Sequence, residues 1–337
     1  MFRRSARGRV AGTFAAGALF LVIQSALAQI TLDGTLGRSG SLVGPNYAIP
    51  ASVGRQVGGN LFHSFGRFSV YNGESATFSG PGSVSNIIGR VTGGYASTID
   101  GLLRSTISGA NLFLINPKGV MFGPNASLDI SGSFYASTAD YLALGSTGRF
   151  DATNPSATVL VSAPPSAFGF LSAAAGALEV NGSTLSVNAG KNLSFIGGSV
   201  SITDATLQAP AGYINIASVA GAGEARISGN QVVLPSGVER GAIELTNSEA
   251  SVDSAEGLPA GKIVIRGGTL RLLESYLSSS NSEAAPGGGI EIDVSGEFSM
   301  QGGQILSSTD GPGAAGNIDV KAHVIALSEA AQILSST

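Results

Sequence analysis

Few side chains in this sequence could form a reactive centre. Its 337 residues contain two histidines, His63 and His323, and no cysteine, which excludes the dense His/Cys ligand set of a typical zinc site. A Ser-His-Asp triad would need one of these histidines beside a reactive serine, and no Gly-x-Ser-x-Gly elbow occurs in a strand-turn-helix context. We therefore interpret His63 as a packed or capping residue, and we expect no catalytic residue, metal or cofactor.

The carboxylates that come closest to a catalytic pattern are Glu291 and Asp319, at equivalent positions of two consecutive repeats. A polysaccharide-cleaving site would need several converging carboxylates with a cationic residue beside them. Val264 occupies the preceding repeat and we expect no arginine to join the pair, which favours a solvated face. A polysaccharide-binding or polysaccharide-cleaving protein remains the alternative. Calcium could bind at turns such as those of Asp293 or Asp310, but no loop has regular oxygen-ligand spacing.

A repeat of about 28 residues near the C-terminus sets the spacing of these positions. The runs "GKIVI", "GGIEI" and "GNIDV" recur, as does a serine-rich "LSS" element that begins at Leu277, Leu306 and Leu334. Units of this size without helices bury a core only by stacking on their neighbours. Stacking predicts an inward column of Ile263, Ile290 and Ile318 and an outward column of Arg266, Asp293 and Lys321.

Short runs of alternating apolar residues, bounded by Gly, Asn and Ser, continue this pattern from about residue 178. Such alternation is typical of half-buried strands. The expected fold class is all-β, a parallel β-helix in which each strand pairs with its counterpart one coil later. At about 20–28 residues per coil and ~4.8 Å per coil, we expect about 11–15 coils in a rod about 50–75 Å long.

Composition and the N-terminus limit the function classes. Charged residues make up 12% of the chain, 49 residues are glycine, and the formal net charge is −4, which argues against a basic nucleic-acid-binding protein. Residues 1–28 carry four arginines, an apolar stretch and a final Ala-Leu-Ala, the layout of a secretory signal peptide. The apolar run is shorter than a spanning helix needs, and we expect no transmembrane span after signal removal.

Six motifs occur in order between Gln29 and about Leu171. They are "ITLDGTLG", "GGNLFHSFGRFSVYNGESATF", "NIIGRVTGG", "STIDGLL", "ANLFLINPKGVMFGPNASLDISGSFYASTADYL" and "AFGF". Together they resemble the N-terminal secretion domain of the filamentous haemagglutinin family, the TpsA-type exoproteins of two-partner secretion. The later "GYINIAS" and serine-rich repeats resemble the β-helical continuation of the same family.

The resemblance implies a right-handed, single-stranded parallel β-helix, a pectin-lyase-like solenoid, with an N-terminal capping segment. It implies recognition by an outer-membrane transporter barrel with periplasmic recognition domains, and export through the periplasm and outer membrane of a Gram-negative-type bacterium. The product would be secreted or displayed at the cell surface as an adhesin or haemagglutinin, with a host or cell-surface receptor as a further partner and without enzymatic activity.

Two segments are candidates for the recognition site. The family's Asn-Pro-Asn-Gly turn reads Asn116, Pro117, Lys118, Gly119 here, so a lysine replaces the second asparagine. A tight turn suits these residues, because asparagine can accept a backbone hydrogen bond, proline presets φ and glycine fits the fourth position. Either the turn only shapes the chain or it contacts the partner. The second candidate is the family motif block, which consists of Gly59, Asn60, Leu61, Phe62 and His63.

Three segments follow from these observations. Residues 1–28 are the predicted signal peptide, residues 29–175 the secretion domain with the N-terminal cap and first coils, and residues 176–337 the continuing coils. The last repeat ends after its "LSST" element without a polar cap or closing helix. Because an uncapped end leaves a strand edge open, we expect the natural product to be longer or this chain to be a truncated relative.

Overall fold

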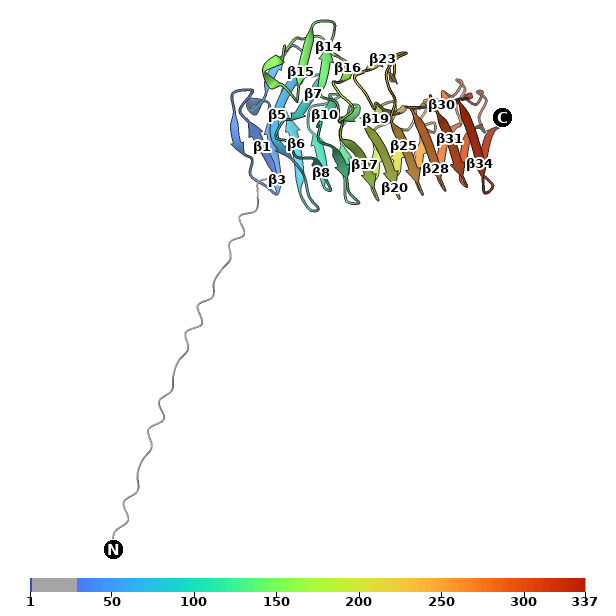
Figure 1. The fold of residues 1–337 in the computed structure, drawn as a ribbon, viewed down its shortest axis with the longest axis horizontal. Coiled ribbons are helices and arrows are strands. Elements are labelled where there is room, and N and C mark those ends of the chain that lie inside the picture. Colours follow the sequence, from blue (N-terminus) through green and yellow to red (C-terminus); the bar gives the residue numbers. More distant parts are fainter. Residues whose placement is uncertain (2–28, 337) are drawn as a thin grey trace.

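The computed structural model describes Met1 and residues 29–336, and residues 29–336 form a rod of stacked β-coils (Figure 1). The predicted signal peptide therefore lies outside the described residues, apart from Met1. Helical structure in the described part is limited to two short 3-10 turns, η1 (Ala51–Val53) and η2 (Pro155–Ala157). None of the helices described there is long and apolar enough to cross a membrane.

Three faces of parallel strands run along the rod. Successive strands of each face pair in parallel across coils, which confirms the predicted parallel β-helix. The long face contains β5 (Asn60–Phe68), β7 (Asn86–Val91), β10 (Asn111–Ile115), β13 (Phe134–Ser137), β19 (Asn192–Gly197), β22 (Tyr213–Ser218), β27 (Lys262–Gly267), β30 (Gly289–Val294) and β33 (Ile318–Lys321). The second face contains β8 (Ser97–Ile99), β11 (Val120–Phe122), β17 (Ala177–Asn181), β20 (Ser199–Thr203), β25 (Ala242–Thr246), β28 (Thr269–Leu273), β31 (Glu297–Gln301) and β34 (Val324–Ser328).

The third face consists of two sheets that follow one another along the rod. The first contains β3 (Asn46–Pro50), β6 (Ser75–Ser79), β9 (Leu102–Ser105) and β12 (Ser127–Asp129). The second contains β18 (Thr184–Ser186), β21 (Thr206–Gln208), β26 (Glu249–Ser251), β29 (Tyr276–Asn281), β32 (Gln304–Thr309) and β35 (Gln332–Ser336).

A capping segment precedes the first coil. In it β1 (Ile30–Asp33) runs antiparallel to both β2 (Ser39–Ser41) and β5, and β4 (Arg55–Val57) also runs antiparallel to β5. These pairings cover the edge of the first coil, which would otherwise expose unpaired backbone groups. The predicted N-terminal cap is therefore present.

An outer antiparallel sheet, which the sequence pattern did not predict, covers part of the long face. Two insertions build it: β14 (Tyr141–Leu144), β15 (Gly148–Asp151) and β16 (Pro165–Phe170) from one, and β23 (Gly223–Ser228) and β24 (Gln231–Val233) from the other. It lies above the N-terminal half of the rod in Figure 1. Pairing of β16 with β23 joins the two insertions, although they leave the rod from different coils.

The outer sheet also explains why our coil number was too high. In the described residues nine strands of the long face stack in parallel, from β5 to β33, against the expected 11–15 coils. At ~4.8 Å per strand this stack is about 40 Å long. The two insertions contain residues that we had counted as parts of coils when we divided the chain length by the length of one coil.

Two apolar cores follow from this arrangement. The first fills the rod with inward residues of all three faces, among them Ile263, Ile290 and Phe195. The second lies between the long face and the outer sheet and includes Phe62 and Phe168. Burying a side chain of this kind stabilises the fold by roughly 1.5–3 kcal/mol.

The predicted strand register is correct for the isoleucine column. In the serine-rich element Leu306 pairs with Leu334, as the repeat suggests, but the step from Leu277 is shifted by one residue. Ile263 pairs with Ile290 and Ile290 with Ile318, as expected. Leu277, however, pairs with Ile305 and not with Leu306. Because a shift of one residue reverses the face of a strand, Ile305 is buried whereas the side chain of Leu306 points outward and is half-buried.

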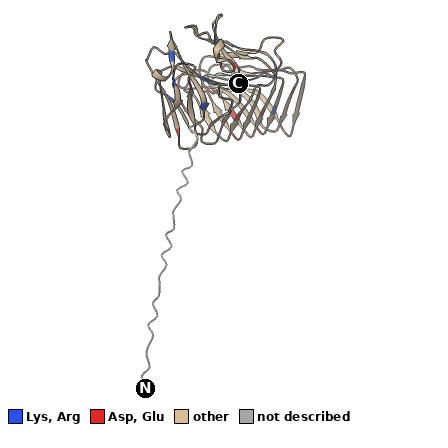
Figure 2. Ribbon diagram, turned by 60° about the vertical axis from the view of Figure 1, so that its left-hand side comes forward, with Lys and Arg blue, Asp and Glu red and all other residues tan. Residues whose placement is uncertain are grey.

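Charged side chains are sparse along the rod, as Figure 2 shows. The outward column of alternating charge is present as predicted, since Arg266 pairs with Asp293 and Asp293 with Lys321. Arg266 is nevertheless buried, because the outer sheet covers it. Its Nε donates to the backbone oxygen of Val232 in β24 at 3.1 Å.

Candidate functional site

The turn Asn116–Gly119 closes the long-face strand β10 and leads into β11. The Asn116 Oδ1 accepts a hydrogen bond from the Lys118 N–H at 3.0 Å, and the Asn116 carbonyl accepts one from the Gly119 N–H at 3.0 Å. Gly119 has a φ of +118°, which favours glycine over residues with a Cβ. The turn therefore has the hydrogen bonds that its sequence predicts.

The Asn116 side chain is fully used inside the rod. Its Nδ2 donates to the Tyr95 carbonyl and to the Ser97 Oγ, both at 2.9 Å, and the residue is 1% exposed. Pro117 and Gly119 are also buried, whereas Lys118 is exposed. Lys118 is thus the residue of this turn whose side chain a partner can reach.

Tyr95, whose carbonyl accepts the hydrogen bond from Asn116, brings a cationic and aromatic pair next to the turn. Arg67 stacks over the Tyr95 ring with its Cζ 3.8 Å from the ring centre, and Tyr95 is 57% exposed. Pro117 and Lys118 also line a cavity of about 230 Å³ together with Thr153 of the outer layer. We call the surface formed by Arg67, Tyr95 and Lys118 the turn corner.

The motif block 59–63 opens β5 and contributes to both cores. Leu61 and His63 point into the rod, and Phe62 points outward beneath the outer sheet. The Phe62 ring lies 5.0 Å from that of Phe150 on β15. This block consequently joins the first coil to the outer layer.

Asn60 begins a ladder of asparagines that crosses three coils. Asn86 Nδ2 donates to Asn60 Oδ1 at 2.9 Å, and Asn111 Nδ2 donates to Asn86 Oδ1 at 3.1 Å. Asn60 Nδ2 in turn donates to the backbone oxygens of Val161 and Ala163, at 3.1 and 2.7 Å. The ladder thereby fastens the outer-layer segment to the first coils through hydrogen bonds between buried amides.

His63 lies in the interior of the first coil and is 0% exposed. Its ring is stacked on Phe65 at 6.1 Å and meets the edge of Phe78 at 5.5 Å. Neither ring nitrogen has a hydrogen-bond partner in the described residues. Burial disfavours the imidazolium and lowers the pKa of His63 to about 4. The structure thus places His63 as a neutral packed residue.

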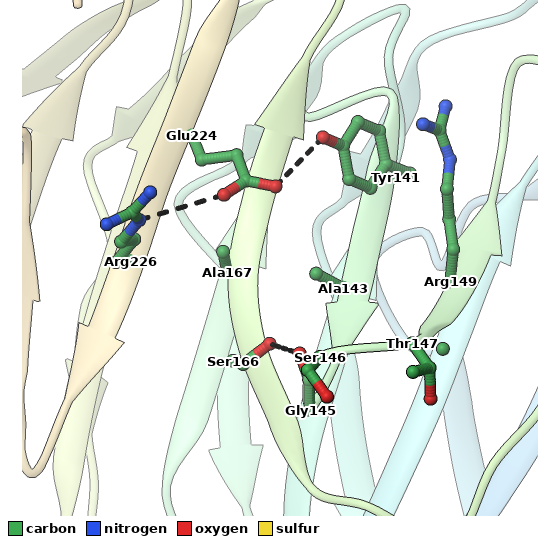
Figure 3. Close-up of a pocket in the computed structure, with 11 residues that line it drawn as sticks. Tyr141, Ala143, Gly145, Ser146, Thr147, Arg149, Ser166, Ala167, Glu224 and Arg226 are labelled. Carbon is green, nitrogen blue, oxygen red and sulfur yellow. Dashed lines mark hydrogen bonds and ion pairs between the residues drawn. The ribbon is translucent and has the colours of Figure 1, made fainter.

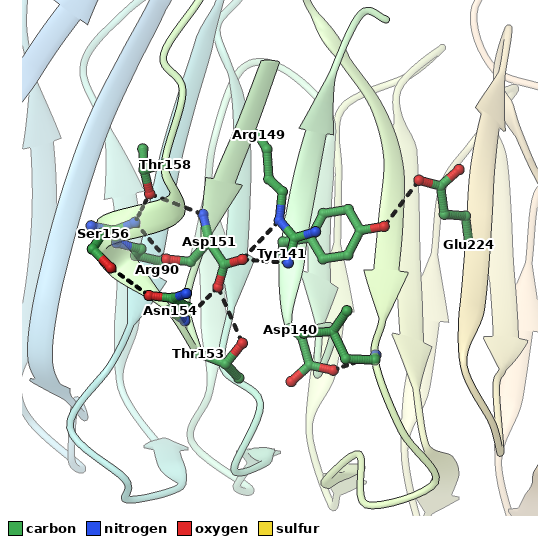
Figure 4. A network of polar contacts seen from close by, with 11 residues as sticks. Arg90, Asp140, Tyr141, Arg149, Asp151, Thr153, Asn154, Ser156, Thr158 and Glu224 are labelled. Atoms are coloured by element: carbon green, nitrogen blue, oxygen red, sulfur yellow. Dashed lines mark hydrogen bonds and ion pairs between the residues drawn. The ribbon is translucent and has the colours of Figure 1, made fainter. Parts of the chain in front are cut away.

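A buried polar network connects the cap, the first coils and the outer sheet. Figure 4 shows the part of it that lies around Arg90 and Asp151. Arg90 donates from Nε to the Ser64 Oγ at 2.7 Å and from Nη2 to the Thr35 Oγ1 at 2.8 Å. Its Nη1 reaches the backbone oxygen of Asp151 and the Thr158 Oγ1. Arg90 was not among the predicted site residues, although an arginine in the otherwise apolar run "NIIGRV" indicates a special set of partners.

The Asp151 carboxylate organises the outer-layer side of this network. It is fully buried, pairs with Arg149, and accepts hydrogen bonds from the Thr153 hydroxyl and the Asn154 N–H. The Arg149 guanidinium also lies over the Tyr141 ring, 3.5 Å from its centre. Figure 4 shows these groups in line with Glu224, whose carboxylate accepts from the Tyr141 hydroxyl at 3.0 Å.

The outer face of the outer sheet holds a trough of about 530 Å³ (Figure 3). Ala143 and Ala167 pair on neighbouring strands, with Arg149 and Arg226 on the strands to either side. Arg226 lies 3.7 Å from Glu224, and Arg149 is paired with Asp151. Because both cations have carboxylate partners, the trough shows no strong preference for one ligand charge.

Glu291, one of the two carboxylates considered for polysaccharide chemistry, is paired with cations. Glu291 does stack on Asp319, with Val264 in the preceding coil. The expectation that no arginine joins it was wrong, because Arg266 lies 2.6 Å and Lys262 2.7 Å from the Glu291 carboxylate. Burial by itself raises the pKa of Glu291, but the hydrogen bond from Lys262 and the charge of Arg266 outweigh it and hold this pKa low. An ionised, paired carboxylate is unsuited to act as a general acid.

Metal-ligating side chains do not gather in the described part of the chain, where no group of three or more His, Cys, Asp or Glu residues could hold an ion. The two histidines lie in different regions, since His63 is in the first coil and His323 is exposed beside β34. The geometry in residues 29–336 brings no triad together.

Comparison with known proteins adds a family assignment to this geometry. The family model described as "TPS secretion domain" matches residues 28–265. Two solved structures with similarity are a filamentous hemagglutinin secretion domain (18% identity, 89% of this chain and 96% of that chain covered, TM-score 0.38) and the HMW1 secretion domain from Haemophilus influenzae (18% identity, 85% and 96% covered, TM-score 0.39). No curated protein matches the chain.

Proposed function

Since the chain belongs to the TPS secretion domain family of two-partner secretion, we propose that an outer-membrane transporter recognises it at the turn corner. We further propose that residues 29–175 carry this recognition and the first steps of folding. In this proposal the remaining coils extend the rod as a non-enzymatic surface that acts as an adhesin at the cell surface or in the medium.

The proposal rests on the different positions of Asn116 and Lys118 in the turn Asn116–Gly119. The side chain and the carbonyl of Asn116 form four hydrogen bonds within the chain, and these bonds stabilise the turn. Lys118 is exposed on the same turn. A partner contact through Lys118, supported by the Arg67–Tyr95 stack, fits an acidic surface on the transporter's periplasmic domains by charge complementarity.

The neutralised carboxylates support the non-enzymatic part of the proposal. Glu291 and Asp293 form ion pairs with Arg240, Lys262 and Arg266. Their negative charges therefore contribute to the stability of the fold. The flat parallel faces of the rod remain as a regular, weakly charged surface for receptor contact.

Binding of the transporter's purified periplasmic domains to the chain tests the proposal. We expect Lys118→Glu to weaken this binding at least about tenfold, because it replaces attraction by repulsion at the contact. Lys191→Glu makes the same change of charge on the loop before β19 and serves as the matched control. Equal binding by wild type and Lys118→Glu, at low ionic strength and with both proteins folded, would refute a contact at the turn corner.

A further inference from the structure

A cavity of about 310 Å³ lies where the cap, the first coils and the outer layer meet. Thr35, Arg55, Arg90 and Thr158 line it, together with three apolar side chains, and none of its lining residues is acidic. We propose that this seam cavity binds a small oxyanion of the phosphate class, held by the two arginines and the Thr158 hydroxyl.

Arg90 is a buried cation at the wall of the seam cavity. Its side chain is 1% exposed, and no carboxylate in the described residues lies within ion-pair distance of it. Burial lowers the pKa of Arg90 to about 10, so the guanidinium stays charged at neutral pH. Four of its N–H groups have partners, which leaves one of the five on Nη2 for a ligand.

Asp33 compensates Arg90 only through intervening hydroxyl groups. The Ser64 Oγ and the Thr35 Oγ1 each lie between the two residues, donating to the Asp33 carboxylate at 2.6 and 2.8 Å. Burial raises the pKa of Asp33, but hydrogen bonds from Ser64, Thr35 and Thr92 outweigh that effect and leave it below its usual value. Asp33 is therefore ionised, with its oxygens already occupied.

The charged side chains around the seam cavity do not balance one another. Asp151 is paired with Arg149, and Asp33 balances Arg90 through the hydroxyls. Arg55 is exposed at the cavity wall, and no ion pair or side-chain hydrogen bond within residues 29–336 involves it. These five groups carry three positive and two negative charges, so one positive charge at the cavity is uncompensated.

The donor set favours a tetrahedral oxyanion over a carboxylate. The cavity offers the N–H groups of Arg55, the remaining Arg90 N–H and the Thr158 hydroxyl, because the Thr35 hydroxyl already donates to Asp33. These are more donors than the two oxygens of a carboxylate can use with good geometry. Phosphate and sulfate present three or four acceptor oxygens, and arginine binds them with charge-assisted, often bidentate hydrogen bonds. Occupation would also link cap, coil and outer layer, which stabilises the folded state by mass action.

Calorimetric titration of the purified full chain with inorganic phosphate, at ionic strength held constant with chloride, tests the site. We expect saturable binding of one phosphate per chain and a higher unfolding temperature in phosphate than in chloride. Arg55→Gln should weaken binding at least about tenfold through loss of a charge-assisted contact. Arg55 is exposed, so this variant is expected to fold.

Arg104→Gln is the matched control, because it removes the same charge from an exposed ion pair with Asp129 on the third face; it should bind phosphate as wild type does. Sulfate binding as tightly as phosphate supports the proposal, whereas acetate binding equally tightly overturns the tetrahedral preference. Tight binding of glycerol 3-phosphate would identify a phosphate monoester headgroup as the natural ligand. Binding of inorganic phosphate but not of glycerol 3-phosphate would identify the free ion as the ligand. Absence of saturable binding, or an unchanged affinity in Arg55→Gln, overturns the site. Export is not measured, so these results are independent of the proposed function.

Discussion

Acidification is expected to destabilise the first coil through His63. The unfolded chain takes up a proton on this side chain near the ordinary pKa of 6.5, whereas the folded chain resists protonation until about pH 4. Between these values the unfolded state binds more protons, so stability falls as the pH falls. Above pH 6.5 both states are neutral and His63 contributes no pH dependence.

The two pKa values fix the size of this effect. One unit of difference corresponds to about 1.4 kcal/mol, so His63 alone should lower the free energy of unfolding by about 2 kcal/mol at pH 5 and about 3 kcal/mol at pH 4. Lowered carboxylate pKa values, such as that of Asp293, also reduce stability in acid, because their contribution is present above the unfolded pKa and is lost below it. A comparison with a variant that lacks only His63 removes this shared contribution.

Urea denaturation of wild type and His63→Leu at a series of pH values from 7.5 to 4 measures the difference. Leucine matches the apolar surroundings of Phe65 and Phe78 and removes a buried N–H without a partner, so the variant should be at least as stable as wild type at pH 7.5. Its advantage should grow by about 2 kcal/mol on going to pH 5. His323→Leu, at an exposed position, should follow the wild-type profile. Parallel profiles for wild type and His63→Leu would show that His63 is not a buried neutral residue.

Three further substitutions test the buried polar contacts. Asn86→Ala should lower the free energy of unfolding in urea by about 1–3 kcal/mol, because it leaves the Asn60 Oδ1 and the Asn111 Nδ2 without a hydrogen-bond partner. Asn188→Ala, at an exposed position, should change it by less than about 0.5 kcal/mol. Arg266→Met should cost about 2 kcal/mol, between the values for exposed and buried ion pairs, and limited proteolysis should cut the second outer-layer insertion faster. Asn116→Ala should lower the unfolding temperature while Lys118→Ala leaves it unchanged, and equal effects would contradict the separate roles given to these residues.

The stacking of the coils could be predicted from the sequence, whereas the outer sheet could not. Ile263, Ile290 and Ile318 repeat with little competition for the inward column, so their register could be predicted. At the serine-rich element Ile305 and Leu306 are both apolar, and the matching serines favoured the alignment that the structure rejects. When two consecutive residues are both apolar, the packing of the whole coil decides which of them faces inward.

The outer sheet had a signal that the alternation pattern hides. Phe62, Ile88 and Phe113 occupy outward positions of the long face and are apolar, and a strand covered on both faces has a continuous apolar run. "NLFHSF", "NIIGRV" and "ANLFLI" are such runs. The contact of Arg266 with Glu291 was missed for another reason, since these residues are diagonal neighbours and only directly stacked positions had been aligned.

Export is the central claim, and one assay tests it most directly. The full chain, expressed in a Gram-negative host with and without its outer-membrane transporter, is quantified in the medium and in the periplasm. The account predicts that the chain reaches the medium only with the transporter and that Lys118→Glu reduces the exported fraction, while Lys191→Glu does not. Equal export without the transporter, or a folded β-rod retained in the periplasm in its presence, would contradict the account.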